Sequence, residues 1–317
     1  MKNIVNPYAR TTFMIRTIQK FTQRYYLRGL PNILYRTRRF IIPADNVITT
    51  VEGVRLLIKR DDYFNNMAIY NYLNTYMLMF LRNVLLLGDT IIDVGANFGQ
   101  IAVIGKKLVG RKGRVFAVEP DTNVIKTLKR NVEINQLELG DITVVDGAFS
   151  DTDGRADFHQ SKQSVFSTLS PAANKYITTI GVITVGTQRI DTFLAAQAII
   201  NVRLIKIDVE GFEQHVLQGA SELIGKGDTI FIVEHHPYAL MCNNCNLDDL
   251  LRLFPVNKYA AFALAEQEGL FYKRKLRLLP LTDPVYLAFA KRMIIDIVML
   301  PAGLRDSVEN FVMKGSS

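Results

Sequence analysis

Short apolar runs alternate along the chain with segments of helical periodicity, starting at Thr90. Continuous apolar runs predict strands buried on both faces of a sheet, and apolar residues three and four positions apart predict helices between them. The predicted strands are Thr90–Val94, Arg114–Val118, Ile142–Val145, Leu204–Asp208 and Thr229–Val233, and the predicted helices are Gln100–Val109, Asn123–Asn135 and Glu213–Ile224. This alternation predicts an α/β fold in which helices cover both faces of a doubly wound, mostly parallel sheet.

The segments around this alternating core have other patterns. Asn46–Thr50 and Val54–Ile58 flank a turn at Glu52-Gly53 and predict a β-hairpin. Residues 66–87 predict a helix that leads into the core, residues 276–285 predict a loop or an edge strand, and Tyr286–Leu300 predicts a packing helix. We therefore expect an N-terminal arm over 1–40, a hairpin and helix over 41–88, the main domain over 89–300 and a C-terminal tail over 301–317.

The N-terminal arm holds the positive charge of the protein. The formal net charge is +8, and residues 1–40 contain no Asp or Glu. The basic residues of the arm are Lys2, Arg10, Arg16, Lys20, Arg24, Arg28, Arg36, Arg38 and Arg39. Several of them recur every four residues beside an apolar face, which predicts an amphipathic helix. Three interpretations stay open: a helix packed on its own domain, a helix on an anionic membrane surface, and a transit peptide.

Few features of the sequence indicate a compartment. No run reaches the roughly 18 apolar residues of a membrane-spanning helix, and the first residues lack the apolar stretch of a secretory signal. Cys242 and Cys245 are the two cysteines, so no disulfide framework is expected, and a zinc site would need two further ligands. We expect a cytoplasmic protein, with the arm at the inner face of a membrane if it binds lipid.

A glycine motif follows the first predicted strand. Asp93-Val-Gly-Ala-Asn-Phe-Gly-Gln closes that strand and opens a helix. Gly95 lets the backbone approach a ligand closely, and the free amides at the helix start favour an anionic group. The spacing of Gly95 and Gly99 differs from the G-x-G-x-x-G pattern that cradles a pyrophosphate, which disfavours a nicotinamide-dependent dehydrogenase.

Polar residues also stand at the ends of the other predicted strands. Glu119-Pro120-Asp121 closes the second strand, where an acid typically accepts hydrogen bonds from ribose hydroxyls. Asp208 ends a later strand and is followed by Glu210, and His235 ends the next one. Ligands bind at the carboxyl ends of strands in open α/β sheets, so we expect these side chains to face one cleft. Asp208 or His235 could act there as a general base.

The same acids form a candidate metal site. Asp208, Glu210, Glu234 and His235 could hold Mg²⁺ or Mn²⁺, which prefer oxygen ligands. A divalent cation is the minor alternative, and we predict no resident metal.

These stretches resemble the FkbM family of S-adenosylmethionine-dependent methyltransferases. The matching segments cover roughly residues 85–240 and are Ile92–Gly99, Val118–Asp121 with Leu128 and Asn131, Gly147–Asp151, Ile205–Glu213 with Val216–Gly219, and Ile232–His235. The first segment is general to class I methyltransferases, whereas Lys206-Ile-Asp-Val-Glu-Gly is more specific to this family. Phe98 stands where the family commonly has a smaller aliphatic residue.

The resemblance implies a class I, Rossmann-like methyltransferase fold with a seven-stranded sheet whose last strand is reversed. It implies S-adenosylmethionine as cofactor, with Asp93, Gly95, Asn97 and Gly99 at its methionine end. Glu119 would hold the ribose, and Asp146 and Ala148 would flank the adenine. It also implies O-methylation, often of a sugar hydroxyl or a natural product.

We therefore predict an O-methyltransferase that acts on a hydroxyl of a sugar, a glycan or glycolipid, or a natural product, with Asp208, Glu210 and His235 as catalytic candidates. The expected partners are a small-molecule, glycan or lipid-linked sugar acceptor and, through residues 1–40, an anionic membrane. Residues 1–60, 151–190 and 245–317 are expected to select the acceptor.

Two alternatives belong to other functional classes. A nucleic-acid methyltransferase is disfavoured, because Asp-Val-Glu-Gly stands where amino-methylating enzymes carry Asn-Pro-Pro-Tyr. A membrane-surface protein that keeps the fold without catalysis is disfavoured by the intact glycine motif and Glu119.

Overall fold

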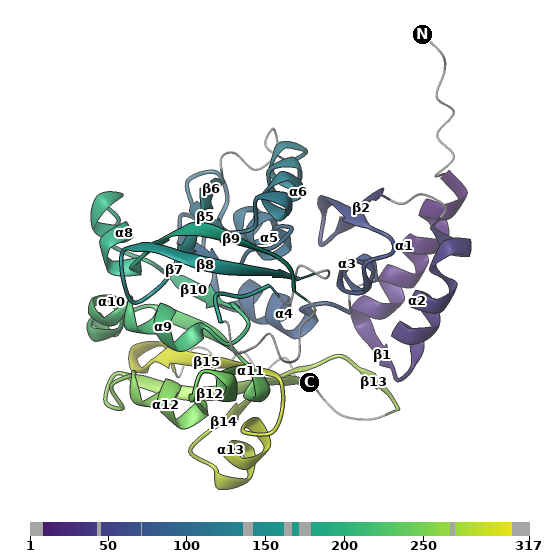
Figure 1. The fold of residues 1–317 in the computed structure, drawn as a ribbon. Helices are drawn as coiled ribbons and strands as arrows, with labels where there is room; N and C mark the ends of the chain where they lie inside the picture. Colours follow the sequence, from purple (N-terminus) through teal and green to yellow (C-terminus); the bar gives the residue numbers. More distant parts are fainter. Residues whose placement is uncertain are drawn as a thin grey trace.

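An eight-stranded sheet forms the centre of the computed structural model, which describes residues 9–42, 46–70, 72–135, 142–161, 167–170, 179–266 and 270–305 (Figure 1). The strand order is β14-β12-β15-β11-β10-β4-β5-β6. Strands β6, β5, β4, β10 and β11 are parallel, and β15 is antiparallel to both of its neighbours. The strands span Thr90–Val94 (β4), Arg114–Glu119 (β5), Thr143–Asp146 (β6), Leu204–Ile207 (β10), Ile230–His235 (β11), Tyr259–Glu266 (β12), Leu276–Pro280 (β14) and Ile295–Pro301 (β15). The predicted α/β fold and its reversed last strand are confirmed.

Helices cover both faces of this sheet. One layer contains α4 (Thr75–Val84), α5 (Gln100–Val109) and α6 (Thr122–Glu133). The other contains α8 (Ile190–Ala196), α9 (Glu213–Gln218), α10 (Ser221–Lys226), α11 (Pro237–Cys242), α12 (Leu247–Arg252) and α13 (Pro284–Ala290). Successive strand residues point to opposite layers, so Ile91 belongs to the first core and Ile92 to the second. Burial on both faces explains why the central strands are continuously apolar.

A small second sheet lies between β6 and β10 in the sequence. It has the order β7-β9-β8, with β7 (Ala148–Phe149), β9 (Thr179–Gln188) and β8 (Gly154–Ser161). Figure 1 shows β8 and β9 as long ribbons in front of the central sheet. Phe158 in β8 lies close to the carboxyl ends of the central strands, because it lines the same pocket as Glu119.

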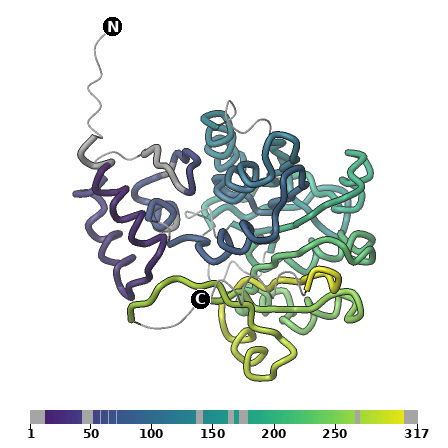
Figure 2. Tube along the Cα trace, turned by 180° about the vertical axis from the view of Figure 1, so that it is seen from behind, coloured from purple at the N-terminus to yellow at the C-terminus, as the bar shows by residue number. Residues whose placement is uncertain are grey.

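The N-terminal segments form a flank at one end of the molecule (Figures 1 and 2). They are α1 (Ala9–Arg24), β1 (Tyr25–Leu27), α2 (Leu30–Ile41), β2 (Asn46–Val51), β3 (Val54–Lys59) and α3 (Tyr63–Ile69). Strand β1 pairs with β13 (Phe271–Lys273) from the C-terminal part. The last described element is the short 3-10 helix η3 (Ala302–Leu304). None of the described helices is long and apolar enough to cross a bilayer.

The predicted helix over Tyr286–Leu300 is wrong. This segment forms the end of α13 and then strand β15, which lies between β11 and β12 in the sheet. Every residue of β15 is buried, so its sequence is apolar at all positions except Asp296 and shows no alternation. A short continuous apolar run fits a buried helix and a buried strand equally well, and only strand pairing decides between them.

Other boundaries differ as well. The predicted helix over 66–87 is divided into α3 and α4, because Asn74 adopts a left-handed conformation with φ of 56° just before α4. The segment Glu213–Ile224 contains two short helices, α9 and α10. The central sheet has eight strands within the described residues, instead of seven, since β14 adds to its edge beside β12.

Two buried amides tie the hairpin strand β3 to the main domain. Asn131 in α6 accepts a hydrogen bond from the Leu57 N–H at 2.5 Å and donates to the carbonyls of Leu57 at 3.2 Å and Phe98 at 2.7 Å. One turn later, Asn135 accepts from the Arg55 N–H at 3.0 Å and donates to the Arg55 carbonyl at 2.6 Å. One side chain of α6 and one just beyond its end thus satisfy backbone groups of β3 as a neighbouring strand would.

We expect Asn131→Ala to lower the free energy of unfolding by about 2–3 kcal/mol, because it removes the partner of one buried and two partly buried backbone groups. Chemical denaturation measures the change. Asn83→Ala is the matched control, since the Asn83 amide is exposed and donates to Met79 within its own helix; its effect should stay below about 0.5 kcal/mol. Equal losses in the two variants would contradict this role of Asn131.

Candidate functional site

A pocket opens where the parallel strands of the central sheet end. Segments at the ends of β4, β5, β6 and β10 line it, together with Glu234 in β11, Phe158 in β8 and the two residues before α4. The predicted site residues that line it are Gly95, Asn97, Glu119, Pro120, Ala148, Asp208 and Glu210. The predicted site residues outside its lining are Asp93, Gly99, Asp121, Asp146 and His235.

The loop between β4 and α5 passes very close to the end of β10. Gly95 has a φ of 75°, and a Cβ atom there would lie 1.8 Å from the Asp208 carbonyl oxygen. Gly99 has a φ of 87°, and a Cβ atom there would lie 2.3 Å from the Leu128 side chain. Glycine is required at both positions, since a side chain would meet both backbone strain and a neighbouring group. Gly99 therefore packs against α6 and does not line the pocket, whereas Gly95 lines it.

Glu119 is held at the end of β5 by two backbone amides. Its Oε2 accepts from the Asn97 N–H and its Oε1 from the Asp121 N–H, each at 2.9 Å. Burial raises the pKa of Glu119 to about 7, although these two hydrogen bonds lower it in part. Asp121 instead caps α6, where its carboxylate accepts from the Asn123 N–H at 2.8 Å. The loops after β4 and β5 are thus joined through Glu119.

A buried ammonium in the wall of the pocket lies near two carboxylates. The Lys206 Nζ is 2.9 Å from Asp208 Oδ2 and 3.7 Å from Asp93 Oδ1. Asp93 pairs directly with Lys206 across β4 and β10, so the two side chains share one face of the sheet. Burial would lower the pKa of Lys206, but Asp208 and Asp93 outweigh it and raise that pKa. Asp93 is fully buried, and its carboxylate is the second negative group next to the Lys206 ammonium.

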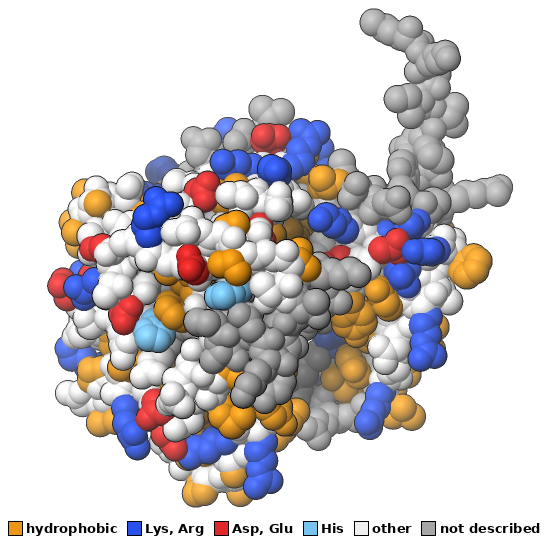
Figure 3. All heavy atoms as spheres, viewed as in Figure 1, with side chains coloured by type: hydrophobic (Ala, Val, Ile, Leu, Met, Phe, Trp, Pro, Cys, Tyr) orange, Lys and Arg blue, Asp and Glu red, His pale blue; other side chains and the backbone are white. Residues whose placement is uncertain are grey.

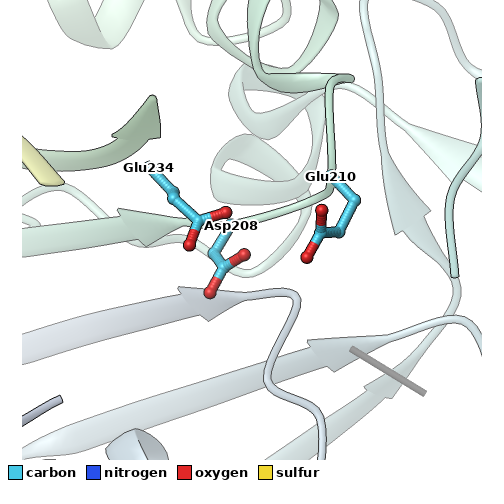
Figure 4. A group of neighbouring side chains, drawn as sticks. All are labelled: Asp208, Glu210 and Glu234. Carbon is cyan, nitrogen blue, oxygen red and sulfur yellow. The ribbon is translucent and has the colours of Figure 1, made fainter. Parts of the chain in front are cut away.

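Asp208 also belongs to a group of three neighbouring carboxylates (Figure 4). One oxygen of each of Asp208, Glu210 and Glu234 lies within 4.8 Å of the others. Burial first, and then repulsion by Asp208, raises the pKa values of Glu210 and Glu234 well above the ordinary value. Glu210 has a φ of 54°, a strained conformation for a residue with a side chain. Glu213 braces this loop, because its Oε1 accepts from the Val209 and Gly211 N–H groups at 3.1 Å.

The same three oxygens are close enough together to coordinate one divalent cation, whose preferred ligands are carboxylate oxygens. His235 is not part of this group. Lys206 already supplies a positive charge to Asp208. The absence of a resident metal stays a prediction. Cys242 and Cys245 are free, and the described residues around them provide no further metal ligands.

His235 points away from the pocket. It follows Glu234 on β11, so its side chain lies on the opposite face of the sheet and pairs in register with Ile295. It is 1% exposed, and burial lowers its pKa to about 4. The expectation that it faces the same cleft as Asp208 is therefore wrong. His236 caps α11, where its Nδ1 accepts from the Ala239 N–H at 3.2 Å.

Sequence patterns missed several side chains that line the pocket. Asn74 and Gln100 come from the starts of α4 and α5, and Phe158, Leu169 and Phe212 supply apolar surface. Phe158 and Leu169 belong to the segment 151–190 that was expected to select the acceptor. Segments 1–60 and 245–317 supply none of the described lining residues. A polar stretch without periodicity gave no signal that these residues approach the strand ends.

Comparison with known proteins agrees with this geometry. The family model described as the methyltransferase FkbM domain matches residues 93–254. This range includes the glycine loop between β4 and α5, Glu119 and the acidic cluster of Asp208, Glu210 and Glu234. The chain belongs to the FkbM methyltransferase family. Its family match ends within the C-terminal part, at Phe254 before β12.

Individual relatives are more distant. The 2-O-methyltransferase NoeI of Sinorhizobium fredii is 26% identical over 178 residues, which cover 52% of this chain and 70% of that protein. The probable cobalt-precorrin-6B C(15)-methyltransferase (decarboxylating) of Sulfurisphaera tokodaii is 33% identical over 60 residues, 19% of this chain and 30% of that protein. The solved methyltransferase FkbM from Methylobacillus flagellatus KT has 17% identity and a TM-score of 0.41, over 75% of this chain and 55% of that chain.

Asp296 adds a further buried carboxylate beside the acidic cluster. It lies opposite Glu234 in the register of β15 and β11. Burial, followed by repulsion from Asp208, raises its pKa to about 7. Since this value lies above the ordinary 3.8, the stability that protonated Asp296 contributes is complete below pH 3.8 and is lost as the pH rises through about 7.

We expect Asp296→Asn to increase the free energy of unfolding at pH 8 by about 1–3 kcal/mol, because the amide removes a buried charge of nearly the same shape. At pH 5, where Asp296 is already protonated, the increase should be much smaller. Denaturant titrations at the two pH values measure the difference. Glu222→Gln, at an exposed carboxylate, is the control and should show no such pH dependence. A gain of equal size at both pH values would contradict the explanation.

Proposed function

We propose that this FkbM-family protein is an S-adenosylmethionine-dependent O-methyltransferase whose acceptor is a hydroxyl of a sugar, a glycan or glycolipid, or a natural product. The observation that carries the proposal is a single pocket that joins the glycine loop and Glu119 to the carboxylates of Asp208 and Glu210. A cofactor-binding half and a proton-accepting half thus meet in one cavity. The name of NoeI, a 2-O-methyltransferase, supports an oxygen acceptor.

The cofactor half fits S-adenosylmethionine, the expected cofactor of the family. Gly95 leaves space beside the end of β10, and the start of α5 offers backbone amides to a carboxylate. Glu119 borders the pocket and can accept from ribose hydroxyls, and Ala148 lies where the third parallel strand ends. Asp146 is exposed and outside the lining, so its backbone neighbours Gly147 and Ala148 mark the adenine end. The bound cofactor supplies a methyl group activated on a sulfonium.

The acceptor half fits a compound with several hydroxyls. Asp208, held by Lys206 at 2.9 Å, is placed to take the proton of the reacting hydroxyl. Glu210 and Glu234 lie within 4.8 Å and can accept hydrogen bonds from neighbouring hydroxyls. Phe158, Leu169 and Phe212 provide an apolar wall for the carbon faces of a ring. Carboxylates on one side and aromatic surface on the other favour a sugar over a simple alcohol.

The same acidity disfavours nucleic acid as the acceptor. Among the described lining residues, Lys206 is the one Lys or Arg, and it is already paired with Asp208, so the pocket offers no free positive charge to the phosphates of a polynucleotide. Acceptors without phosphates need no such charge. The alternative without catalysis predicts that S-adenosylmethionine does not bind, which a titration of the full chain decides.

We expect Glu119→Gln to weaken S-adenosylmethionine binding about tenfold to hundredfold, because a charged acceptor of ribose hydrogen bonds is lost. Calorimetric titration measures the affinity. Since the pKa of Glu119 is raised to about 7, the affinity of the unaltered protein should also fall between pH 8 and pH 6, whereas the variant should change little over this range. Glu133→Gln, at an exposed position on α6, is the control. Unchanged affinity in Glu119→Gln would rule out this cofactor role.

We expect Asp208→Asn to lower the rate of methyl transfer about 10²–10⁴-fold while cofactor affinity stays within about threefold, since a general base contributes to the chemical step. Formation of S-adenosylhomocysteine with sugar and glycolipid acceptors measures the rate, and calorimetry measures cofactor binding. Glu133→Gln again serves as the control. Full activity of Asp208→Asn would remove it as the base, and activity toward RNA alone would overturn the proposed acceptor class.

A further inference from the structure

The outward faces of α1 and α2 combine apolar and basic side chains. Each helix presents three such residues with the same spacing of three and four positions, so that they share one face. We call this surface the arm face, and its residues are Phe13, Arg16, Lys20, Ile33, Arg36 and Phe40. Phe40 is 90% exposed, Phe13 is 76% exposed and Ile33 is 59% exposed. Figure 3 shows apolar and basic side chains next to each other on this flank.

The positive charges of the arm face are available for a partner. Arg38 and Arg39, on the same helix as Arg36, both pair with Asp61 at 2.9 and 3.3 Å. Arg16, Lys20 and Arg36 form no ion pair with any carboxylate in the part of the chain that the structure describes. Glu52 lies near Arg16 and Lys20, but it pairs with Arg82.

The arm face is fixed to the main domain from behind. Gln19 donates to the Ile69 carbonyl at 2.7 Å, and the Arg274 guanidinium donates to the Thr22 carbonyl at 2.7 Å. Ile15 and Leu34 are buried in the core that also contains α4 and α5. Strand β1 pairs with β13 beside them. The inner faces of both helices are therefore occupied, and the arm face is the side left for another molecule.

We propose that the arm face docks on a bilayer that carries anionic lipids. Phe13, Ile33 and Phe40 would enter the boundary between headgroups and acyl chains, and Arg16, Lys20 and Arg36 would contact lipid phosphates. A nucleic acid would satisfy the charges but would leave Ile33 and two widely exposed phenylalanines in water. A bilayer accommodates both kinds of side chain. Docking would hold the pocket at a fixed position relative to the bilayer surface.

The test is sedimentation of the full chain with vesicles of phosphatidylcholine alone and of phosphatidylcholine mixed with phosphatidylglycerol. We expect binding to the mixed vesicles, and about a 100-fold weaker partition for the triple variant R16Q/K20Q/R36Q. The double variant F13S/F40S should bind about tenfold more weakly. The matched controls are R111Q/K112Q/K129Q, three exposed basic residues elsewhere, and V256S/V285S, two exposed valines. Thermal unfolding confirms that all variants fold.

Four outcomes would overturn the proposal. They are no binding to mixed vesicles at low salt, equal losses in the arm-face and control variants, undiminished binding of F13S/F40S, and binding to RNA without binding to vesicles. The third would mean that charge alone attracts the protein to lipid, and the fourth would assign the face to a nucleic acid. S-adenosylmethionine binding by each variant, which should be unchanged, separates this surface from the pocket.

Discussion

The ion pair that Lys206 forms with Asp208 and Asp93 lies at the middle of the sheet, and the pocket is built on it. Lys206 comes from β10, the strand between β4 and β11, so one ammonium reaches carboxylates from two strands. A buried carboxylate without such a partner costs several kcal/mol. Lys206 offsets part of this cost for Asp93, although burial still raises the pKa of Asp93. The close approach of Gly95 to the Asp208 carbonyl oxygen depends on the same alignment of β4 and β10.

Above this pair, negative groups outnumber positive ones, and that imbalance gives the pocket its chemical character. Glu210, Glu234 and Asp296 all have raised pKa values, because burial and mutual repulsion disfavour their charged forms. Such groups are stabilised by hydrogen-bond donors that carry no negative charge, and hydroxyls meet this requirement. The arm face has the opposite character, since it is basic and apolar. The proposed acceptor site and the proposed docking surface are thus separate regions of the molecule.

Much of the fold could be predicted from the pattern of apolar residues, because central strands that are covered on both faces must be apolar throughout. Strands β4, β5, β10 and β11 and helices α5 and α6 lie within one or a few residues of their predicted positions. Strand β15 could not be recognised in the same way. Its apolar run follows α13 closely and resembles the continuation of a helix. Its partner β11 is distant in the sequence, and β14 comes between β15 and its other partner, β12, along the chain.

The sequence by itself determined the glycine loop, the acid that ends β5 and the acids that follow β10, since each belongs to a local motif at the end of a strand. Only the tertiary structure decided that His235 faces away from the pocket while Glu234 faces into it, because adjacent residues of a strand point to opposite sides of the sheet. It also brought Asn74, Phe158 and Phe212 to the pocket from separate elements. No local pattern contains such contacts, since they depend on how layers pack and not on the spacing of residues along the chain.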